Sequence, residues 1–124
     1  MADRKLKILI VDDEMEILKL LKEVFELRGW DIIVTPVGTS VPIILDKEAV
    51  DVVLLDIKLP DGSGLDILKE TRKKYPKLPI IMFTALGYED RVVNEAMRSG
   101  ASGYVSKGTA IHELIDVVNN ALLQ

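Results

Sequence analysis

The sequence has no cysteine and a single histidine among its 124 residues. The lack of cysteine excludes a disulfide framework and thiolate chemistry. No apolar run approaches the roughly 18–20 residues of a membrane span, and Met1–Lys7 does not have the pattern of a signal peptide. A formal net charge of −4 argues against nucleic acid as a direct ligand, because a phosphate backbone needs a basic patch. We therefore expect a cytoplasmic protein that binds neither a membrane nor nucleic acid directly.

The composition itself is that of an ordinary folded domain. Hydrophobic residues make up 48% of the chain and charged residues 29%, a balance typical of globular proteins. The length suits one domain covering residues 1–124, and no internal repeat or linker divides it.

Several short apolar runs end in a polar residue, and Val52–Asp56 is the most informative. Its valines and leucines run directly into a carboxylate, as in a strand buried on both faces of a parallel sheet. The other expected strands are Leu6–Val11, Trp30–Thr35, Ile80–Phe83 and Gly103–Val105.

Apolar residues repeat at helical spacing between these runs. The expected helices carry Ile17–Phe25, Pro42–Lys47, Leu65–Lys74, Val92–Met97 and Ile111–Leu122. Asp13 and Glu16 resemble a capping box for the first helix, and Thr109 is a plausible N-cap for the last. Strict alternation of strand and helix predicts an α/β fold in which helices cover both faces of a parallel sheet.

Chemically useful side chains gather at the carboxyl ends of the expected strands, where open α/β sheets bind ligands. They are Asp12, Asp13, Asp56, Thr84 and Lys107. If the first, third and fourth strands are neighbours, three carboxylates converge. Two like charges about 4 Å apart repel by roughly 4 kcal/mol at an effective dielectric of about 20, so a counter-charge is needed. Oxygen ligands without histidine or cysteine suit Mg²⁺.

A carboxylate in such a site can attack phosphorus and form an aspartyl phosphate, which identifies Asp56 as a candidate nucleophile. Phosphoryl transfer mainly requires positioning and charge neutralisation. Lys107 would supply charge, and the Thr84 hydroxyl and the Ala85 N–H would donate hydrogen bonds. Singly, each residue has a structural explanation as a cap, turn, strand-end or solvated residue. Four acid or base positions at one edge, namely Asp12, Asp13, Asp56 and Lys107, are harder to dismiss. His112 is expected to have a surface role.

At this point the sequence resembles the receiver domains of two-component response regulators. The resemblance covers essentially the whole chain. The matching segments are Ile8–Glu14, Val53–Gly64, Phe83–Ala85, Gly100–Ala101 and Tyr104–Lys107.

The resemblance implies a flavodoxin-like, doubly wound sheet of five strands in the order 2-1-3-4-5, with five helices. It also implies that Asp56 is the phosphoacceptor. Asp13, Asp56 and the Lys58 backbone carbonyl would bind Mg²⁺ directly, and Asp12 would act through a bound water. Thr84 and Lys107 would contact the phosphoryl group.

The resemblance further implies partners. A sensor histidine kinase or phosphotransfer protein would donate the phosphoryl group, and small phosphodonors such as acetyl phosphate could replace it. Thr84 and Tyr104 match the family's switch pair, which would change the surface of the fourth helix, fifth strand and last helix for a downstream effector protein or domain. The chain would catalyse only its own phosphorylation and dephosphorylation, as a monomer or a phosphorylation-dependent dimer. Val117, Ala121 and Leu123, outside the last helix's main stripe, could contribute to such a surface or reflect frayed packing.

Two departures from the family pattern stand out. Gly108 follows Lys107 where the family usually has proline, often after a cis bond, so we expect a looser loop around Lys107. Pro36–Pro42 interrupts a segment where the family usually continues into a regular second helix.

Three other functions are open to this sequence. A Mg²⁺-dependent aspartyl-phosphate hydrolase of the haloacid dehalogenase type would place an acid two residues after the nucleophile, where this chain has Lys58. A degenerate receiver could serve as a constitutive interaction domain, but the acid set is intact. A flavodoxin-type FMN binder would meet repulsion between its phosphate and Asp12–Glu14.

Overall fold

Parallel strands form one sheet with the order β2-β1-β3-β6-β7 in the computed structural model, which describes residues 5–123. Their bounds are β1 Lys7–Val11, β2 Asp31–Thr35, β3 Val52–Leu55, β6 Ile80–Thr84 and β7 Gly103–Ser106. Counted along the chain, this is the order 2-1-3-4-5, so the predicted doubly wound fold is confirmed. The expected turn after β3 contains an additional small antiparallel pair, β4 Lys58–Leu59 and β5 Gly62–Ser63.

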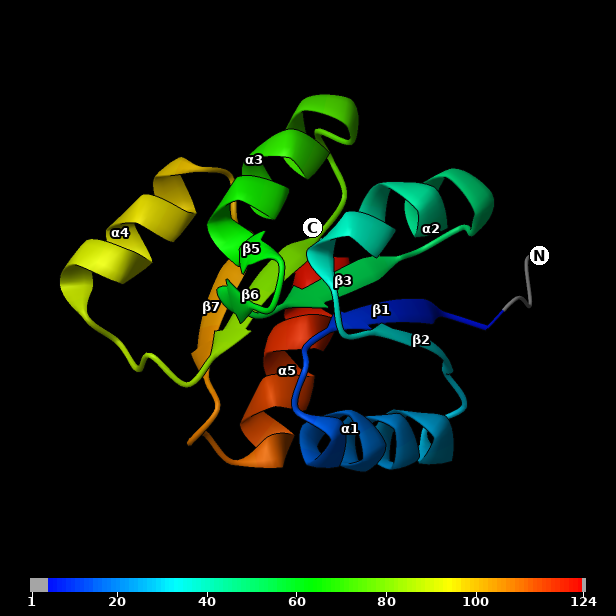
Figure 1. Cartoon of the computed structure of the whole chain (residues 1–124). Coiled ribbons are helices and arrows are strands. Elements are labelled where there is room, and N and C mark those ends of the chain that lie inside the picture. The colour runs from blue at the N-terminus through cyan, green and yellow to red at the C-terminus, as the bar shows by residue number, and fades with distance from the viewer. Residues whose placement is uncertain (1–4, 124) are drawn as a thin grey trace.

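Helices cover both faces of the sheet (Figure 1). They are α1 Met15–Leu27, α2 Val41–Lys47, α3 Gly64–Lys74, α4 Asp90–Arg98 and α5 Ile111–Leu122. Helices α1 and α5 lie on one face, and α2, α3 and α4 lie on the other. The short second helix is confirmed, and a 3₁₀ turn, Gly38–Ser40, precedes it in place of further α-helix.

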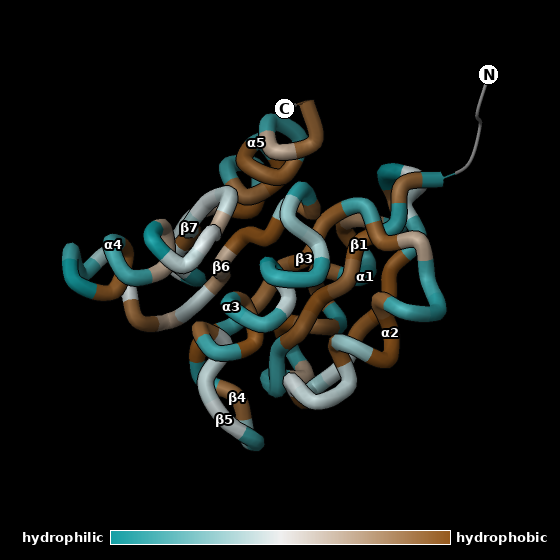
Figure 2. The backbone as a smooth tube through the Cα atoms, turned by 90° about the horizontal axis from the view of Figure 1, so that it is seen from above, coloured by the Kyte–Doolittle hydropathy of each residue, from teal (hydrophilic) through white to brown (hydrophobic). Residues whose placement is uncertain are grey.

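Alternation along the central strands separates the core into two layers. Ile8 and Ile10 of β1 pack with α1 and α5, whereas Leu9 and Val11 pack with the helices of the opposite face. All four are at most 1% exposed. Because both faces are covered, the strand sequence is apolar throughout, as the brown trace along β1 and β3 shows in Figure 2.

Both predicted N-caps are wrong. The residue before α1 is Glu14, whose side chain makes no capping hydrogen bond; the Glu14 amide donates to Asp12 Oδ1 at 2.9 Å instead. The residue before α5 is Ala110, because the Thr109 hydroxyl is bonded to the Tyr88 hydroxyl at 3.0 Å. Asp13, the predicted cap of the first helix, lies instead beside Asp12 and Asp56 at the carboxyl edge of the sheet.

The proposed partner surface on α5 also needs correction. Ala121 is 7% exposed and belongs to the core, and Val117 packs against that core. Leu123 is 84% exposed, and Val117 is partly exposed, so of the three residues only Ala121 is withdrawn from the surface. The α5 stripe is broader than the sequence pattern suggested because the helix contacts β3 and β7 and shares one core with α1.

Within the described part of the chain, no helix has the length and apolar character needed to cross a bilayer. The first four residues of Met1–Lys7, the segment without a signal-peptide pattern, lie outside the described residues.

Candidate functional site

Two acids continue neighbouring strands at the carboxyl edge of the sheet. Asp12 follows β1 and Asp56 follows β3, whose last residues Val11 and Leu55 are register partners. The Asp12 amide donates to the Thr35 carbonyl at 3.0 Å, and the Asp56 amide donates to the Val11 carbonyl at 3.0 Å. The sheet hydrogen bonds therefore extend to both acids, which are only 1% and 5% exposed.

The predicted convergence of three carboxylates is confirmed. One oxygen each from Asp12, Asp13 and Asp56 lies within 4.8 Å of the others. Asp13 is exposed to solvent while the other two are buried, so the cluster opens outward through Asp13.

Lys107 reaches this cluster from the loop after β7. Its Nζ lies 2.8 Å from Asp12 Oδ2 and 2.9 Å from Asp56 Oδ2, and it also pairs with Glu14. The lysine side chain is 8% exposed. Lys107 thus supplies the cation that the sequence required at this edge.

The electrostatics of the site depend on one buried cation, Lys107, which pairs with three carboxylates. Burial alone would lower the pKa of the Lys107 ammonium, but its contacts with Asp12, Glu14 and Asp56 outweigh burial and raise that pKa above its ordinary value. Burial raises the pKa of the Asp12 carboxyl, and the contacts with Lys107 and the Glu14 amide offset this only partly. The partner of the buried Asp12 Oδ2 is therefore the Lys107 ammonium.

The β6 side of the site supplies uncharged groups. Thr84 is 1% exposed, and its Oγ1 accepts a hydrogen bond from the Leu86 amide at 3.3 Å. A hydroxyl that accepts this bond still has its own hydrogen to donate. A cavity of about 300 Å³ joins this side to the acids; it is lined by Asp13, Glu14, Asp56, Lys58, Thr84, Ala85 and Leu86.

The loop that carries Lys58 is tightly held beneath the cavity. The Gly64 amide donates to the Ile57 carbonyl at 2.6 Å, and a Cβ at Gly64 would lie 1.9 Å from the Asp56 carbonyl oxygen. At the tip of the loop, Asp61 accepts hydrogen bonds from the Gly38 and Thr39 amides at 2.9 Å each, and these bonds lower the pKa of Asp61.

Tyr104, the other residue of the expected switch pair, lies beside this site on β7. Its ring centroid is 5.8 Å from that of Tyr88, with an interplanar angle of 52°. Its hydroxyl oxygen is buried and has no hydrogen-bond partner within residues 5–123. Burial raises the pKa of this phenol.

The structure brings the three acids and Lys107 together and places Thr84 and Ala85 on the same cavity as Asp13 and Asp56. It also adds two residues that the sequence reasoning missed. Glu14 is a partner of Lys107, and Tyr88 bonds to the loop after β7. Glu14 could have been identified because it directly follows the acid pair. No local pattern marks Tyr88, since its contacts are distant in sequence.

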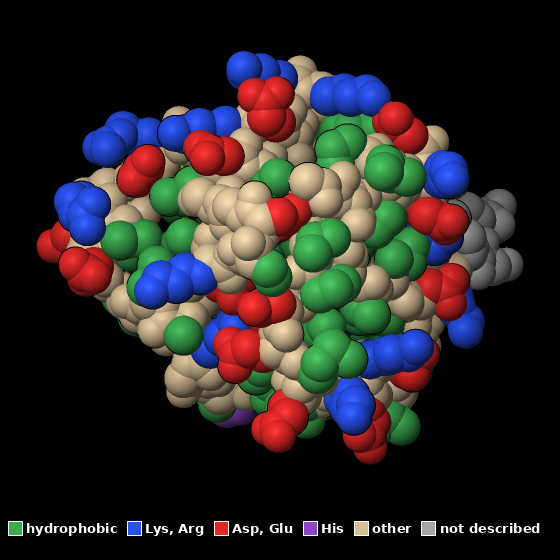
Figure 3. Space-filling model, viewed as in Figure 1, with side chains coloured by type: hydrophobic (Ala, Val, Ile, Leu, Met, Phe, Trp, Pro, Cys, Tyr) green, Lys and Arg blue, Asp and Glu red, His purple; other side chains and the backbone are tan. Residues whose placement is uncertain are grey.

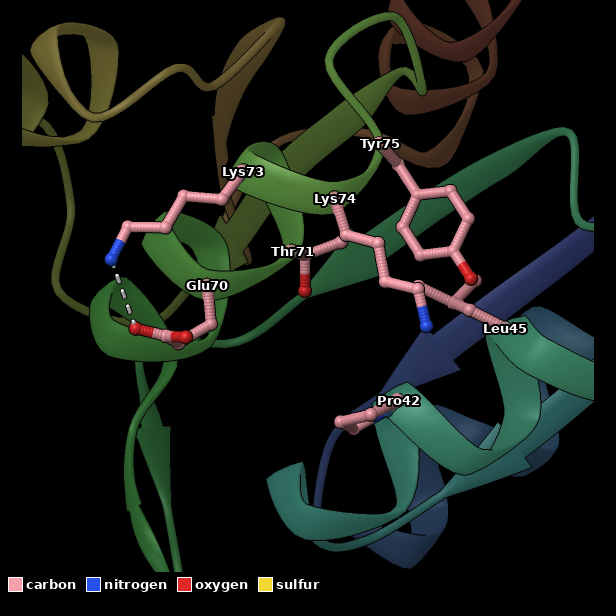
Figure 4. Close-up of a pocket in the computed structure, with 7 residues that line it drawn as sticks. All are labelled: Pro42, Leu45, Glu70, Thr71, Lys73, Lys74 and Tyr75. Carbon is pink, nitrogen blue, oxygen red and sulfur yellow. Dashed lines mark hydrogen bonds and ion pairs between the residues drawn. The ribbon is translucent and has the colours of Figure 1, made fainter.

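The remaining surface offers no comparable cluster among the described residues. Acidic and basic side chains meet near the middle of the face in Figure 3, and apolar ones gather over α2 and β2, where Ile43 is 58% exposed. A cavity of about 400 Å³ lies between α2 and α3, with Pro42 and Leu45 on one side (Figure 4). Its lysines are already paired, Lys73 with Glu70 and Lys74 with Asp46.

Comparisons with a family model and with known sequences give the same family for this chain. A model of the response regulator receiver domain matches residues 8–119. The chain is 40% identical over 110 residues to the transcriptional regulatory protein CpxR of Klebsiella pneumoniae subsp. pneumoniae, covering 88% of this chain and 46% of that protein. It is 35% identical over 109 residues to the probable transcriptional regulatory protein TcrX of Mycobacterium tuberculosis, covering 87% and 46%. The chain therefore spans about half the length of the curated relatives it matches.

Solved structures agree on the fold. A CheY-like response regulator receiver domain protein from Methanospirillum hungatei JF-1 superposes with a TM-score of 0.90 at 27% identity, over 96% of this chain and 94% of that one. The BeF₃-activated N-terminal receiver domain of Klebsiella pneumoniae RstA also gives a TM-score of 0.90, at 30% identity, over 95% of this chain and 99% of that one.

Proposed function

Because the chain belongs to the family of response regulator receiver domains, we propose that it is a phosphorylation-controlled switch in which Asp56 accepts the phosphoryl group. The observation that supports this most strongly is the position of Asp56. It is a buried carboxylate at the end of a central strand, it lies 2.9 Å from a lysine ammonium, and it lines a cavity with Thr84 and Ala85.

The residues present also fit a magnesium ion. The donors are oxygens only, and three carboxylates lie within 4.8 Å of one another. We propose that Asp13, Asp56 and the Lys58 carbonyl hold Mg²⁺, with Asp12 acting through a bound water. When bound, the ion would neutralise negative charge on the phosphoryl oxygens.

The protein's own groups would carry the transfer. An Asp56 carboxylate oxygen attacks phosphorus, the bond between phosphorus and the donor's leaving group breaks, and the leaving group takes that electron pair. Lys107 faces the transferred oxygens with its ammonium, and the Thr84 hydroxyl and the Ala85 N–H donate hydrogen bonds to them. These contacts stabilise charge that spreads over the phosphoryl group during transfer.

The output would pass through Thr84 and Tyr104 to the surface of α4, β7 and α5. Thr84 has a hydrogen to donate, and the Tyr104 hydroxyl is buried without a partner in the described structure, so both groups could exchange contacts when Asp56 is modified. A downstream effector protein or domain would recognise the changed surface, with the chain acting as a monomer or as a phosphorylation-dependent dimer.

The proposed phosphodonor is a phosphohistidine on a sensor histidine kinase or phosphotransfer protein. Residues 1–124 are proposed to be one receiver domain, and a cytoplasmic location belongs to the same proposal. The hydrolase alternative is not favoured by the family assignment. It also lacks its general acid, since Lys58 occupies the second position after Asp56.

The direct test is covalent labelling by acetyl phosphate, read by intact-protein mass spectrometry. We expect the wild-type protein to be labelled in Mg²⁺, and labelling to be abolished by Asp56→Asn or by chelation of the metal. Asp116→Asn, at an exposed position of α5, is the matched control and should be labelled as the wild type is. Full labelling of Asp56→Asn, or labelling without a divalent ion, would contradict the proposal. Failure to label the wild type would favour the degenerate-receiver alternative.

A further inference from the structure

Tyr88 lies in the loop between β6 and α4 and reaches across to the loop after β7. It therefore connects two loops beside the candidate phosphoryl site. It follows Thr84–Ala85 by a short turn, in which Gly87 has a φ of +73°, a conformation that glycine adopts without steric cost. The turn directs Tyr88 back across the carboxyl edge toward the loop after β7.

The Tyr88 hydroxyl spans both ends of that loop. It accepts a hydrogen bond from the Ser106 amide at 3.0 Å, and it lies 3.0 Å from Thr109 Oγ1 in a second hydrogen bond. Lys107 is between these two contacts. Tyr88 therefore fixes the residues on either side of the lysine without touching the lysine itself.

Beyond the Lys107 amide, which donates to the Thr84 carbonyl at 2.8 Å, the backbone of this loop has few restraints of its own. The Thr109 amide donates to the Ser106 carbonyl at 2.9 Å, and the Gly108 amide donates to Ser106 Oγ at 3.3 Å. Around Gly108 there is open space, since the nearest atom to a Cβ built there would be Ser106 Oγ at 3.8 Å. With glycine at this position, residue 108 contributes no side chain that could pack the turn against the rest of the molecule.

The Tyr88 ring adds a second contact. It packs on the ring of Tyr104 at 5.8 Å between centroids, over a phenol whose hydroxyl is buried and without a partner among residues 5–123. One side chain from the β6–α4 loop therefore touches both the turn that carries Lys107 and the aromatic residue of β7.

We infer that Tyr88 is a positioning residue for phosphoryl transfer to Asp56: by holding Ser106 and Thr109, its hydroxyl aims Lys107 at the site. This rests on the phosphoacceptor role proposed above. Loss of the hydroxyl leaves the groups proposed to bind Mg²⁺ in place but lets the turn that carries Lys107 move. Transfer and binding of a phosphoryl mimic should therefore weaken, while Mg²⁺ binding should not.

The test is Tyr88→Phe, which removes one oxygen and keeps the ring, with Tyr75→Phe as the matched control. The Tyr75 hydroxyl bonds to Asp46 between α2 and α3, away from the site. We expect the initial rate of labelling by acetyl phosphate and the affinity for beryllofluoride to fall about fivefold in Tyr88→Phe, the factor of about one ordinary hydrogen bond. Amide hydrogen exchange at Ser106 should accelerate. Mg²⁺ affinity by titration calorimetry and the melting temperature should match the wild type, and Tyr75→Phe should match it in every measurement.

A second variant, Thr109→Val, removes the other partner of the same hydroxyl. Its effect should be about twofold, and it should not add fully to that of Tyr88→Phe, because both disrupt one set of contacts. Wild-type rates and beryllofluoride affinity in Tyr88→Phe would overturn the inference while leaving the role of Asp56 intact. A parallel loss of Mg²⁺ affinity and melting temperature would also overturn it, since the residue would then be merely structural. A wild-type protein that is never labelled would remove the proposed function and this inference together.

Discussion

Asp12 and Asp56 directly follow β1 and β3, whereas Lys107 lies in the turn after β7. The amides of both acids remain in the hydrogen-bond pattern of the sheet, at 3.0 Å from the Thr35 and Val11 carbonyls. The lysine amide is also held, at 2.8 Å from the Thr84 carbonyl, but the chain beyond it turns at Gly108. The sheet therefore fixes the distance between the acids, and a long side chain on a less constrained turn brings the cation to them.

We call the surroundings of Asp12, Asp56 and Gly64 the acid side, and the turn with Lys107 and Gly108 the lysine side. Substitutions on the acid side should affect folding, while substitutions on the lysine side should affect the geometry of phosphoryl transfer. On the acid side, Gly64 lies so close to the Asp56 backbone that no larger residue fits there. The lysine side has room at Gly108 and depends on hydrogen bonds from another loop.

The largest expected effect is on the acid side. Gly64→Ala would place its Cβ 1.9 Å from the Asp56 carbonyl oxygen and 2.8 Å from the carbonyl carbon. The strand and the helix would have to separate, so we expect the free energy of unfolding to fall by about 3 kcal/mol or more. Urea denaturation with metal chelated measures it. A loss below about 1 kcal/mol would show that the backbone around Asp56 yields easily, and the contrast between the two sides would then be wrong.

The acid side was also the part that the sequence predicted well. A strand covered on both faces is apolar at every position, so Asp12 and Asp56 stand out as the first polar residues after their apolar runs. The strand order then brings β1 and β3 together, and the acids with them. The small β4–β5 pair was not predicted, because each strand has only two residues and the segment reads as a turn.

The lysine side was harder to predict because its contacts join distant residues. Lys107 and Glu14 are 93 positions apart, and Tyr88 and Ser106 are 18 apart. Capping rules consider only the few residues around a helix start, so Thr109 was assigned to α5 although its hydroxyl bonds to Tyr88. The expectation that Gly108 loosens the turn agrees with the open space around it, and the bond before it is trans, since no cis peptide bond occurs in residues 5–123.

An intermediate effect of opposite sign is expected at Asp12. Burial raises the pKa of this carboxyl, so its ionised form destabilises the metal-free protein. Asp12→Asn keeps an oxygen to accept from the Glu14 amide, and Lys107 keeps Asp56 and Glu14 as partners. We expect the variant to be more stable by about 1 kcal/mol at neutral pH with metal chelated, because it removes one of several like charges that surround a single cation.

The pH dependence of this gain checks its cause. Below the ordinary carboxyl pKa of 3.8, Asp12 is protonated in the folded and unfolded states, so the variant and the wild type should be equally stable. As the pH rises from there through the raised pKa of the folded state, the wild type loses stability relative to Asp12→Asn. Thermal denaturation across this range measures the difference. A gain that does not change with pH would mean that packing, and not charge, explains it. Saturating Mg²⁺ should reduce the gain, because the proposed metal site would favour the carboxylate.

The smallest expected effect is at Gly108, on the lysine side. A Cβ there would meet only Ser106 Oγ at 3.8 Å, an ordinary van der Waals distance, and the backbone does not have a positive φ. Gly108→Ala should therefore change the free energy of unfolding by no more than about 0.5 kcal/mol in urea denaturation, while alanine restricts the unfolded chain and the turn slightly. If the turn is loose in the folded protein, the labelling rate should stay equal to or rise slightly above the wild-type rate. A large loss of stability at Gly108, comparable to that at Gly64, would mean that the turn is packed as tightly as the strand ends and that Lys107 needs no help from Tyr88.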